Sequence, residues 1–252
     1  MNDFIHIHLN SSNAIKFYNS SYNSQVEFSL PLLDLPSEYT IYLSVCHVAI
    51  PYSFYNINSS NNFLVYSVLG QIYTLTIPVG NYTTNNLLST LKNLFINTFS
   101  ITYSSITNQL TFTNNQDFIF YYNSTDPITL QSTCFGILGF SLNYQYSSNK
   151  TLVSNTMVNL SSVRCLCICS QFQTQNISTI ALNKRNILCS IPIHVSPFTM
   201  ITYENQGYKT NLNSNIFNSV IINIMDQDGN YINFNGIHWS ITLQLEIVNY
   251  VN

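Results

Sequence analysis

Three cysteines at alternating positions, Cys165, Cys167 and Cys169, are the residues of this chain whose type and spacing most suggest chemistry. Because successive side chains of a β-strand point to opposite faces, all three would lie on one side of a strand. Thiolates are soft metal donors, but structural zinc sites usually take their cysteines in pairs across a turn. A free cysteine also packs as a small buried hydrophobe. We therefore expect free thiols in the core and no bound metal.

Two histidines, His6 and His8, would share one face of an N-terminal strand, and two imidazoles so spaced can hold a metal ion. A third ligand is not visible nearby in the sequence, and outward-facing polar positions of a strand account for both residues. His47 and His194 lie in apolar segments. We expect them to be hydrogen-bonded core or rim residues and not catalysts.

The ten acidic residues are spread thinly, so paired carboxylates for hydrolysis are not evident. Glu27 and Glu246 are expected at exposed strand positions. The stretch Asp226-Gln227-Asp228-Gly229 faintly resembles a calcium loop, but it lacks the later ligands, so we interpret it as a turn. The sequence contains no nucleophile elbow, phosphate loop or dinucleotide fingerprint. We expect no catalytic residues, no cofactor and no enzymatic activity.

Charge is scarce in this chain of 252 residues. Only 7% of the residues are charged, against about a quarter in an ordinary domain. The seven Lys and Arg residues are scattered, which argues against direct binding to nucleic acid. Met1–Asn10 does not look like a signal peptide, and no apolar run is long enough to span a membrane. A surface without charge favours a structural subunit that neighbours cover.

Strand patterns dominate the elements that would position these residues. In Ile237–Ile247, Trp239 and four aliphatic residues alternate with polar ones, as in a half-buried strand. Tyr39–Ile50 is apolar at nearly every position and predicts a central strand buried on both sides, ended by Pro51. The other expected strands are Gln25–Leu30, Phe63–Leu69 and Gln71–Ile77 around Gly70, Ile101–Tyr103 and Gln109–Thr113 joined through Asn108, Val163–Gln171, Ile187–Val195, and Tyr231–Phe234 after the Asp228-Gly229 turn.

One helix is predicted over Thr83–Phe95, with Thr83 as N-cap. Its apolar stripe comprises Leu87, Leu88, Leu91, Leu94 and Phe95. A weaker helical turn is expected within Thr129–Leu138, stopped by Gly139. Asn143–Asn155 and Gln173–Asn186 are polar and are expected to be loops. We expect an all-β sandwich in a single domain, residues 1–252. Residues 1–24 would form an N-terminal arm or strand, and residues 60–155 insertions between core strands.

Several short motifs, in their order, resemble those of the penton, or minor capsid, proteins of virophages and the related Polinton-like viruses. Each motif alone is weak, and the resemblance depends on their order and spacing over Gln25–Ile247. In those proteins an apolar strand runs into a proline and then an asparagine, as Tyr39–Asn56 does here. A Pro-x-Gly-x-Tyr turn then opens a leucine-rich helix, and a Leu-Gly-Phe follows. An Asp-Gly turn with a later Phe and Gly comes near the end. The matching positions are Pro51, Asn56, Pro78, Gly80, Tyr82, Gly139, Phe140, Asp228, Gly229, Phe234 and Gly236.

The resemblance implies a single jelly-roll β-sandwich of about eight main strands, with one inserted helix and extra hairpins. It also implies a homopentamer at the five-fold vertices of an icosahedral capsid, in contact with the major capsid protein, in a virion assembled in the host cytoplasm. The sequence departs from the family in one region. An acidic residue and a Leu-Leu-Arg that relatives carry are missing from Cys165–Phe172 and Asn186–Cys189, so contacts made by those charges are not expected here.

A different class of function is also open, namely a receptor- or carbohydrate-binding β-sandwich such as a virion attachment head. Aromatic residues make up 14% of the chain, and tyrosines commonly stack on sugars. Clustering of Tyr144, Tyr146, Tyr203 and Tyr208 on one exposed tip would favour that reading, whereas dispersal would favour a capsid subunit. An enzyme on a β-sandwich ranks last.

Overall fold

The computed structural model describes residues 3–19, 22–36, 38–95, 99–123, 130–143, 145–147, 149–172 and 186–249. The chain divides into two compact units. The terminal unit comprises Met1–Phe54 and Val163–Asn252, and the inserted unit comprises Tyr55–Ser162. Each unit has its own hydrophobic core. The insertions that the sequence places within one domain at about residues 60–155 therefore have an interior of their own, because their apolar residues pack on one another.

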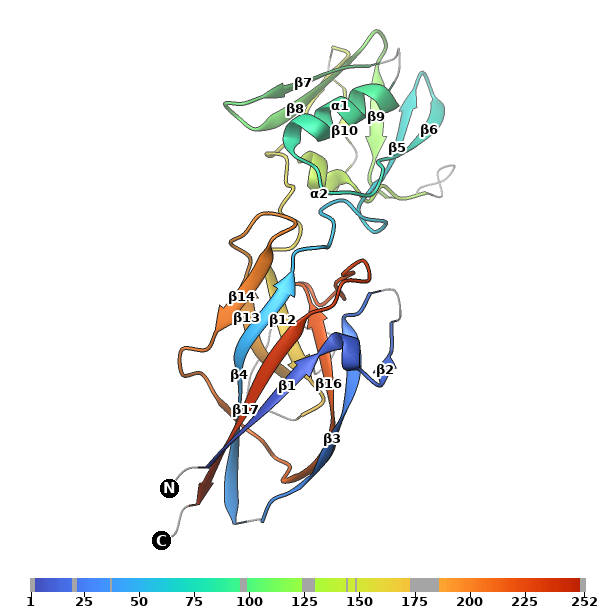
Figure 1. The fold of residues 1–252 in the computed structure, drawn as a ribbon. Helices are drawn as coiled ribbons and strands as arrows, with labels where there is room; N and C mark the ends of the chain where they lie inside the picture. The colour runs from blue at the N-terminus through green and yellow to red at the C-terminus, as the bar shows by residue number, and fades with distance from the viewer. Residues whose placement is uncertain are drawn as a thin grey trace. The chain divides into compact units, whose positions relative to one another are not determined.

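The terminal unit contains ten described strands in two five-stranded sheets (Figure 1). One sheet has the order β1-β17-β4-β14, with β15 also paired to β4, and the other has the order β13-β12-β16-β3-β2. The strand bounds are β1 Asp3–Asn10, β2 Lys16–Phe17, β3 Gln25–Asp34, β4 Tyr39–Pro51, β12 Cys165–Ser170, β13 Asn186–Pro192, β14 Met200–Glu204, β15 Thr210–Asn211, β16 Ile216–Met225 and β17 Ser240–Asn249.

The order of the strands is that of a jelly roll. If the two-residue strands β2 and β15 are set aside, eight strands remain, and they can be lettered B to I in chain order. The sheets then read B-I-D-G and C-H-E-F, which is the double-sheet arrangement of this fold. The predicted jelly-roll class is thereby confirmed. The inserted unit lies between strands D and E of this scheme, that is, between β4 and β12.

The two sheets of the terminal unit pack face to face through one core, and β17 with the preceding Trp239 supplies much of it. Trp239 and the alternate residues Ile241, Leu243 and Leu245 are at most 2% exposed, as the alternation in the sequence predicts. Ile222 and Ile224 of β16, in the opposite sheet, are completely buried in the same core. At about 25 cal/mol per Å² of buried apolar surface, this interior is the main source of the unit's stability.

The expectation for β4 was wrong in one respect, because this strand is buried on one face and not on both. Ile41, Leu43 and Val45 point into the core, and so do Val48 and Ile50, while His47 is exposed. The pairing with β17 shifts between Thr242 and Leu243, which leaves one extra residue in β4. Such a bulge reverses the alternation of side chains. Before the bulge the odd-numbered residues of β4 face the core, and after it the even-numbered ones do. In the sequence, the two half-buried segments therefore resemble one strand that is apolar throughout.

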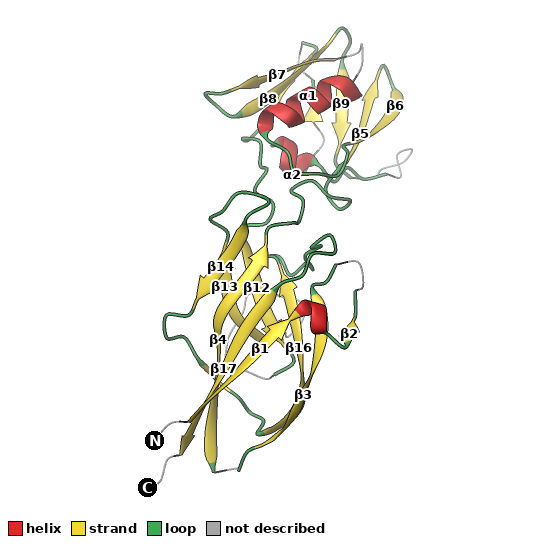
Figure 2. Ribbon diagram, in the orientation of Figure 1, coloured by secondary structure: helices red, strands yellow, loops and turns green. Residues whose placement is uncertain are grey.

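The inserted unit contains a sheet of order β10-β9-β5-β6, a sheet of order β11-β8-β7, and two helices (Figure 2). The bounds are β5 Phe63–Val68, β6 Gln71–Thr76, α1 Thr84–Leu94, β7 Phe99–Ser104, β8 Gln109–Asn114, β9 Phe118–Tyr121, α2 Phe135–Leu138, β10 Gln145–Tyr146 and β11 Thr151–Val153. Both predicted hairpins are present. Thr83 caps α1 by accepting a hydrogen bond from the Asn86 amide, and Leu87 and Leu91 are completely buried, so the helix prediction is confirmed. Leu94, which was expected in the same apolar stripe, is 37% exposed.

Some local predictions need correction. Tyr231–Phe234 is not a strand, because only Tyr231 pairs, in an isolated bridge to Met225. Asn143–Asn155 is not only loop, since it contains the short strands β10 and β11. The strands β9, β14 and β16 were not predicted. The loop expected at Gln173–Asn186 lies outside the described residues except for Asn186, which begins β13.

Candidate interaction surfaces and motif positions

The segment that follows Pro51 contacts the turn that carries the motif residues Phe234 and Gly236. The Ser53 hydroxyl donates a hydrogen bond of 2.8 Å to the Phe234 carbonyl, and the Asn235 side chain donates one of 2.6 Å to the Ser53 carbonyl. The Phe54 ring meets the completely buried Phe234 ring edge-on at 6.2 Å. Gly236 has a φ of +78°, a conformation that suits glycine. The segment after Pro51 is thus tied to the Phe234–Gly236 turn.

Asp226, and not the motif residue Asp228, organises the preceding turn. The Asp226 carboxylate accepts hydrogen bonds from the backbone amides of Asp228 and Asn230, at 2.9 and 2.8 Å, and from the Asn230 side chain at 3.0 Å. Gly229 follows with a φ of +85°. A carboxylate that accepts these donors serves the turn itself, as an Asx turn does. The turn interpretation of this stretch is confirmed.

In the inserted unit, Asn56 joins two motifs that are distant in sequence. Its side-chain carbonyl accepts from the Tyr82 amide and its side-chain NH₂ donates to the Tyr82 carbonyl, both at 2.9 Å. Ile57 and Gly80 form a two-way backbone bridge beside it. The Tyr82 hydroxyl donates back to the Pro78 carbonyl at 2.8 Å. These contacts fix the turn from which α1 begins.

Gly139 ends α2 in the left-handed conformation, with a φ of +80°. A Cβ atom at this position would collide with the Thr156 carbonyl oxygen, because the Gly139 carbonyl itself accepts hydrogen bonds from the Thr156 amide and hydroxyl. The adjacent Phe140 ring is 4% exposed and lies 5.6 Å from the Phe120 ring. Gly139 and Phe140 therefore close the inserted core.

The three alternating cysteines lie on one side of β12, as predicted, but this is not the side of the main core. Leu166 and Ile168 enter that core, whereas Cys167 and Cys169 pack with Met225 in a small separate cluster. Burial, followed by the neighbouring Cys165, raises the pKa of the Cys167 thiol to about 11. Among the described residues, no group of three or more His, Cys, Asp or Glu side chains is arranged to hold a metal.

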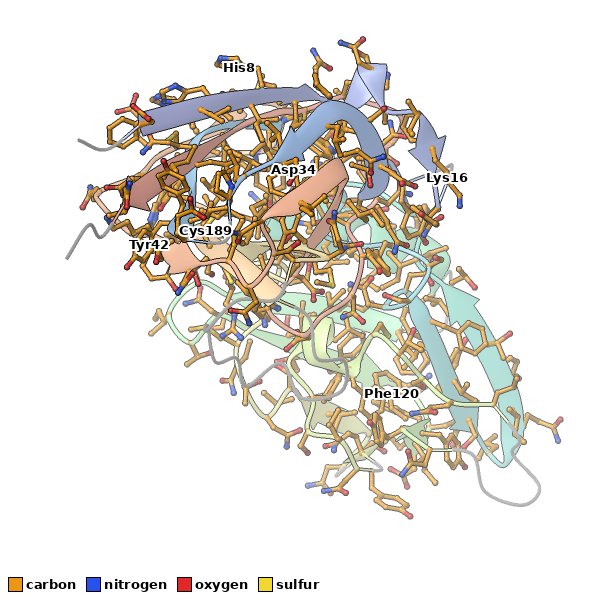
Figure 3. All side chains as sticks on the ribbon, turned by 90° about the horizontal axis from the view of Figure 1, so that it is seen from below. His8, Lys16, Asp34, Tyr42, Phe120 and Cys189 are labelled. Atoms are coloured by element: carbon orange, nitrogen blue, oxygen red, sulfur yellow. The ribbon has the colours of Figure 1, made fainter. Side chains whose placement is uncertain are left out.

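The histidines lie at exposed positions. His8 projects from the outer face of β1 (Figure 3), and His6 is exposed on the same strand. The rings of His6 and His8 lie within hydrogen-bond distance of Gln244 and Thr242 of β17, at 3.1 Å each. His47 and His194 are also exposed, so a core position was wrong for both. The reason for His47 is the β-bulge, which turns its side chain outward.

Glu246 is not the exposed strand residue that the sequence suggested. It is 9% exposed, and its carboxylate accepts from the Lys209 ammonium at 2.5 Å. The same ammonium lies 4.6 Å from the centre of the Tyr42 ring. Lys209 comes from the loop before β15, which only the tertiary fold brings over this face. An ion pair so placed holds that loop to the sheet.

A pocket of about 370 Å³ lies where β12 ends beside the start of β16. Its walls include Gln171, Phe172, Leu212 and Phe217, and none of its lining residues is ionisable. The Gln171 side chain donates to the Ser219 carbonyl at 3.0 Å and accepts from the Ile221 amide at 2.6 Å. The Gln171 side-chain amide thus satisfies backbone groups of β16.

The tyrosines proposed for an attachment tip come from different parts of the chain. Tyr146 belongs to the inserted unit and is 63% exposed, whereas Tyr203 and Tyr208 belong to the terminal unit. Tyr203 is only partly exposed, in β14. Tyr144 lies outside the described residues. Within neither unit do the described residues of this set form a cluster of three.

Large apolar side chains are exposed at several turn tips. Ile106, Phe198 and Leu69 are 91%, 80% and 72% exposed. Single exposed apolar residues are common on protein surfaces, so exposure alone does not mark a contact site. None of the described helices is long and apolar enough to cross a membrane.

No protein-family model and no curated protein matches this chain. Among solved structures, the crystal structure of the selenomethionine-labelled mavirus penton protein is similar, with a TM-score of 0.52 and 10% sequence identity. The similarity covers 98% of this chain and 100% of that chain, so it includes both units. At this identity the likeness shows the fold, and it confirms the resemblance to a virophage penton protein at that level.

Proposed function

We propose that this chain is a structural virion protein that forms the pentameric five-fold vertex of an icosahedral capsid, next to the major capsid protein. The observation that carries this proposal is the extent of the fold likeness. The mavirus penton protein matches over its whole length and over 98% of this chain. A jelly roll alone is common to many proteins, but a jelly roll with an inserted unit between strands D and E is a more specific arrangement.

The position of the motif residues supports the proposal. They fix the two turns where the chain leaves β4 and where α1 begins, and they close both cores. Residues of this kind define a shape and not a reaction. The uncharged surface is a second support, because polar uncharged faces can be buried against neighbours without the large desolvation penalty of ions. A five-membered ring is a heterologous assembly, so its two contact faces differ.

Native mass spectrometry and light scattering of the purified chain test the oligomeric state. We expect a species of five times 28.7 kDa. The pentamer should persist between low and high salt, because screening acts on charges that this chain mostly lacks. A well-behaved monomer at high protein concentration would contradict the proposal and favour a monomeric attachment head.

The capsid position needs a second experiment, since a pentamer could belong to another minor subunit. Co-expression with the major capsid protein of the same virus, followed by electron microscopy of the particles, should place density for this chain at the five-fold vertices. Particles with closed vertices that lack this chain would refute the assignment.

A further inference from the structure

Two bulky apolar residues, Leu69 and Phe198, combine an unfavourable backbone conformation with high exposure. Their φ angles are +50° and +68°, and their side chains are 72% and 80% exposed. A positive φ in a bulky residue is uncommon, because the Cβ atom approaches the following carbonyl oxygen. Neither side chain recovers this loss by burial within its own chain.

Elsewhere in the chain, this backbone conformation is mostly occupied by asparagine. Among the described residues, the other left-handed positions that are not glycine are Asn23, Asn108, Asn149, Asn235 and Lys150. Asparagine tolerates this conformation because its short side chain can bond to the local backbone. A chain that places asparagine at four such positions has leucine and phenylalanine at two exposed tips. The apolar side chains at those tips are therefore not explained by the folding of the turns.

The turn that carries Phe198 is held on both sides. The Thr199 amide donates to the Ser196 carbonyl at 3.3 Å, so Ser196 to Thr199 form a β-turn with Pro197 at its second position. A positive φ at the third position makes this a type II turn, which favours glycine or asparagine there. The Phe198 amide also donates to the Tyr52 carbonyl, and the Tyr52 amide to the Thr199 carbonyl, both at 2.9 Å. The phenyl ring is thus presented on a rigid turn.

Leu69 occupies the tip of the β5–β6 hairpin. The loop has two residues, Leu69 and Gly70, with φ angles of +50° and +77°, between the paired residues Val68 and Gln71. This is a type I′ turn, for which Asn-Gly is the preferred sequence. The adjoining strand β6 is the edge of its sheet, and it exposes Ile72 and Tyr73. The tip therefore continues into an exposed apolar strand edge.

The surroundings of both tips indicate the chemistry of their partner. Within the two stretches that carry the tips, no Asp, Glu, Lys or Arg occurs from Tyr39 to Leu91 or from Asn186 to Tyr203. By strand register the charged residue beside the Leu69 tip is Asp117, next to the Val68–Phe118 pair, and its carboxylate already accepts hydrogen bonds from the Ser147 hydroxyl and the Lys150 amide. A partner surface that carried charges would lose their hydration against such tips without gaining an opposite charge. The fitting partner is an uncharged surface rich in apolar, Asn, Ser and Tyr side chains. A second copy of this chain has that composition.

We propose that Leu69 and Phe198 are intersubunit anchors, each held in a strained turn so that it packs into a neighbouring copy of this chain in the assembled ring. The inference rests on the proposed pentamer and adds the residues that hold it together. A rigid aromatic or aliphatic anchor that is desolvated by a neighbour is the usual centre of an interface. The strain persists because the contact needs the apolar side chain at the tip.

The test uses Leu69→Asn and Phe198→Asn, which remove the apolar group and fit the turn better. Ile106→Asn is the matched control for the first, because Ile106 is a more exposed turn residue of the same unit without a positive φ. Leu32→Asn, at a residue 67% exposed in the terminal unit, is the control for the second. Sedimentation velocity over a range of concentrations gives the assembly constant. Thermal unfolding of the dissociated subunit gives Tm.

Each anchor variant should weaken assembly about tenfold or more and yet raise the Tm of the dissociated subunit by about 2–4 °C, since strain is relieved. The controls should change neither quantity in this way. Three results would each overturn this inference alone. They are normal assembly of the anchor variants, equal weakening of assembly by the control substitutions, and a lower Tm of the anchor variants. A wild-type chain that remains monomeric would overturn the pentamer as well.

Discussion

Truncation of Leu91 in α1 measures how much the helix contributes to the inserted unit. Leu91 and Leu87 are completely buried, and the C-cap residue Phe95 is 1% exposed, with its ring 5.1 Å from the Tyr66 ring. Leu91→Ala removes buried methyl groups and leaves a cavity that the surrounding rings can fill only in part. The expected loss in the free energy of unfolding is about 2–5 kcal/mol.

Leu94→Ala is the matched control, because Leu94 lies in the same helix but is 37% exposed. Both substitutions replace Leu by Ala within α1, and Ala has the highest helix propensity, so a loss of stability in either variant does not come from helix propensity. The control should lose less than about 1 kcal/mol. The difference between the two variants then reports burial alone.

Urea unfolding followed by two probes localises the effect. The single tryptophan of the chain, Trp239, is 2% exposed in the terminal unit, and its indole NH donates to the Asn23 carbonyl at 2.7 Å. Its fluorescence reports the terminal unit, whereas hydrogen exchange of residues 55–162 reports the inserted unit. Leu91→Ala should lower the midpoint of the inserted unit by about 1–3 M urea. A shift no larger than that of Leu94→Ala would refute the burial of the stripe in this core.

Three further predictions concern single residues. Complete burial raises the pKa of the Cys134 thiol to about 12. The stabilisation by this thiol should therefore be full below about pH 9 and should fall as the pH rises toward 12. Denaturant midpoints across this range should show a decrease in the wild type that Cys134→Ala lacks. Gly139→Ala should destabilise the inserted unit by more than about 1 kcal/mol, because the new Cβ would collide with the Thr156 carbonyl oxygen. Gly136→Ala is the control, since a Cβ there would have nothing within 4 Å, and it should be neutral or stabilising. Thermal unfolding measures both variants. Asp226→Ala should cost about 1–3 kcal/mol by leaving turn amides unpaired. The control Asp228→Asn, which keeps an acceptor oxygen for the exposed Gln227 side chain, should cost less than about 0.5 kcal/mol in chemical unfolding.

The sequence predicted most of the jelly roll because its strands carry their own signal. In β17, a polar residue at every second position identifies the face directed away from the core, and this can be seen without knowing the partner strand. The helix α1 was equally predictable from the sequence, since Thr83 is a suitable N-cap and Leu87 and Leu91 are at helical spacing. Turns with Gly70 and Asn108 fixed the two hairpins of the inserted unit.

The missed elements lack such local signals. β16 begins with an irregular pairing to β3 between Phe217 and Ser219, so its pattern of buried residues is interrupted. β9 has only four residues, Phe118–Tyr121, and its burial in the inserted core depends on β5 beside it. Neither length nor periodicity distinguishes such a segment from a loop.

The division of the chain into two cores also depends on distant contacts. The aromatic rings of Phe95, Phe112, Phe120 and Phe140 meet in the inserted unit, although they are spread over some 45 residues of sequence. Any of them could equally have belonged to the main sandwich as far as the sequence pattern goes. Their assembly into a separate interior is a choice among long-range pairings, which local patterns do not encode.

By itself, then, the sequence determined several of the long strands, where α1 begins, and that charged residues are scarce, because each of these can be recognised from composition or from neighbouring residues. Only the tertiary structure determined which of these side chains are buried and which are exposed. It placed Cys167 on the side of β12 away from the main core, turned His47 outward through the bulge in β4, and buried Glu246 beneath Lys209. The physical reason is that a side chain's surroundings depend on the register of paired strands and on loops that arrive from far along the chain.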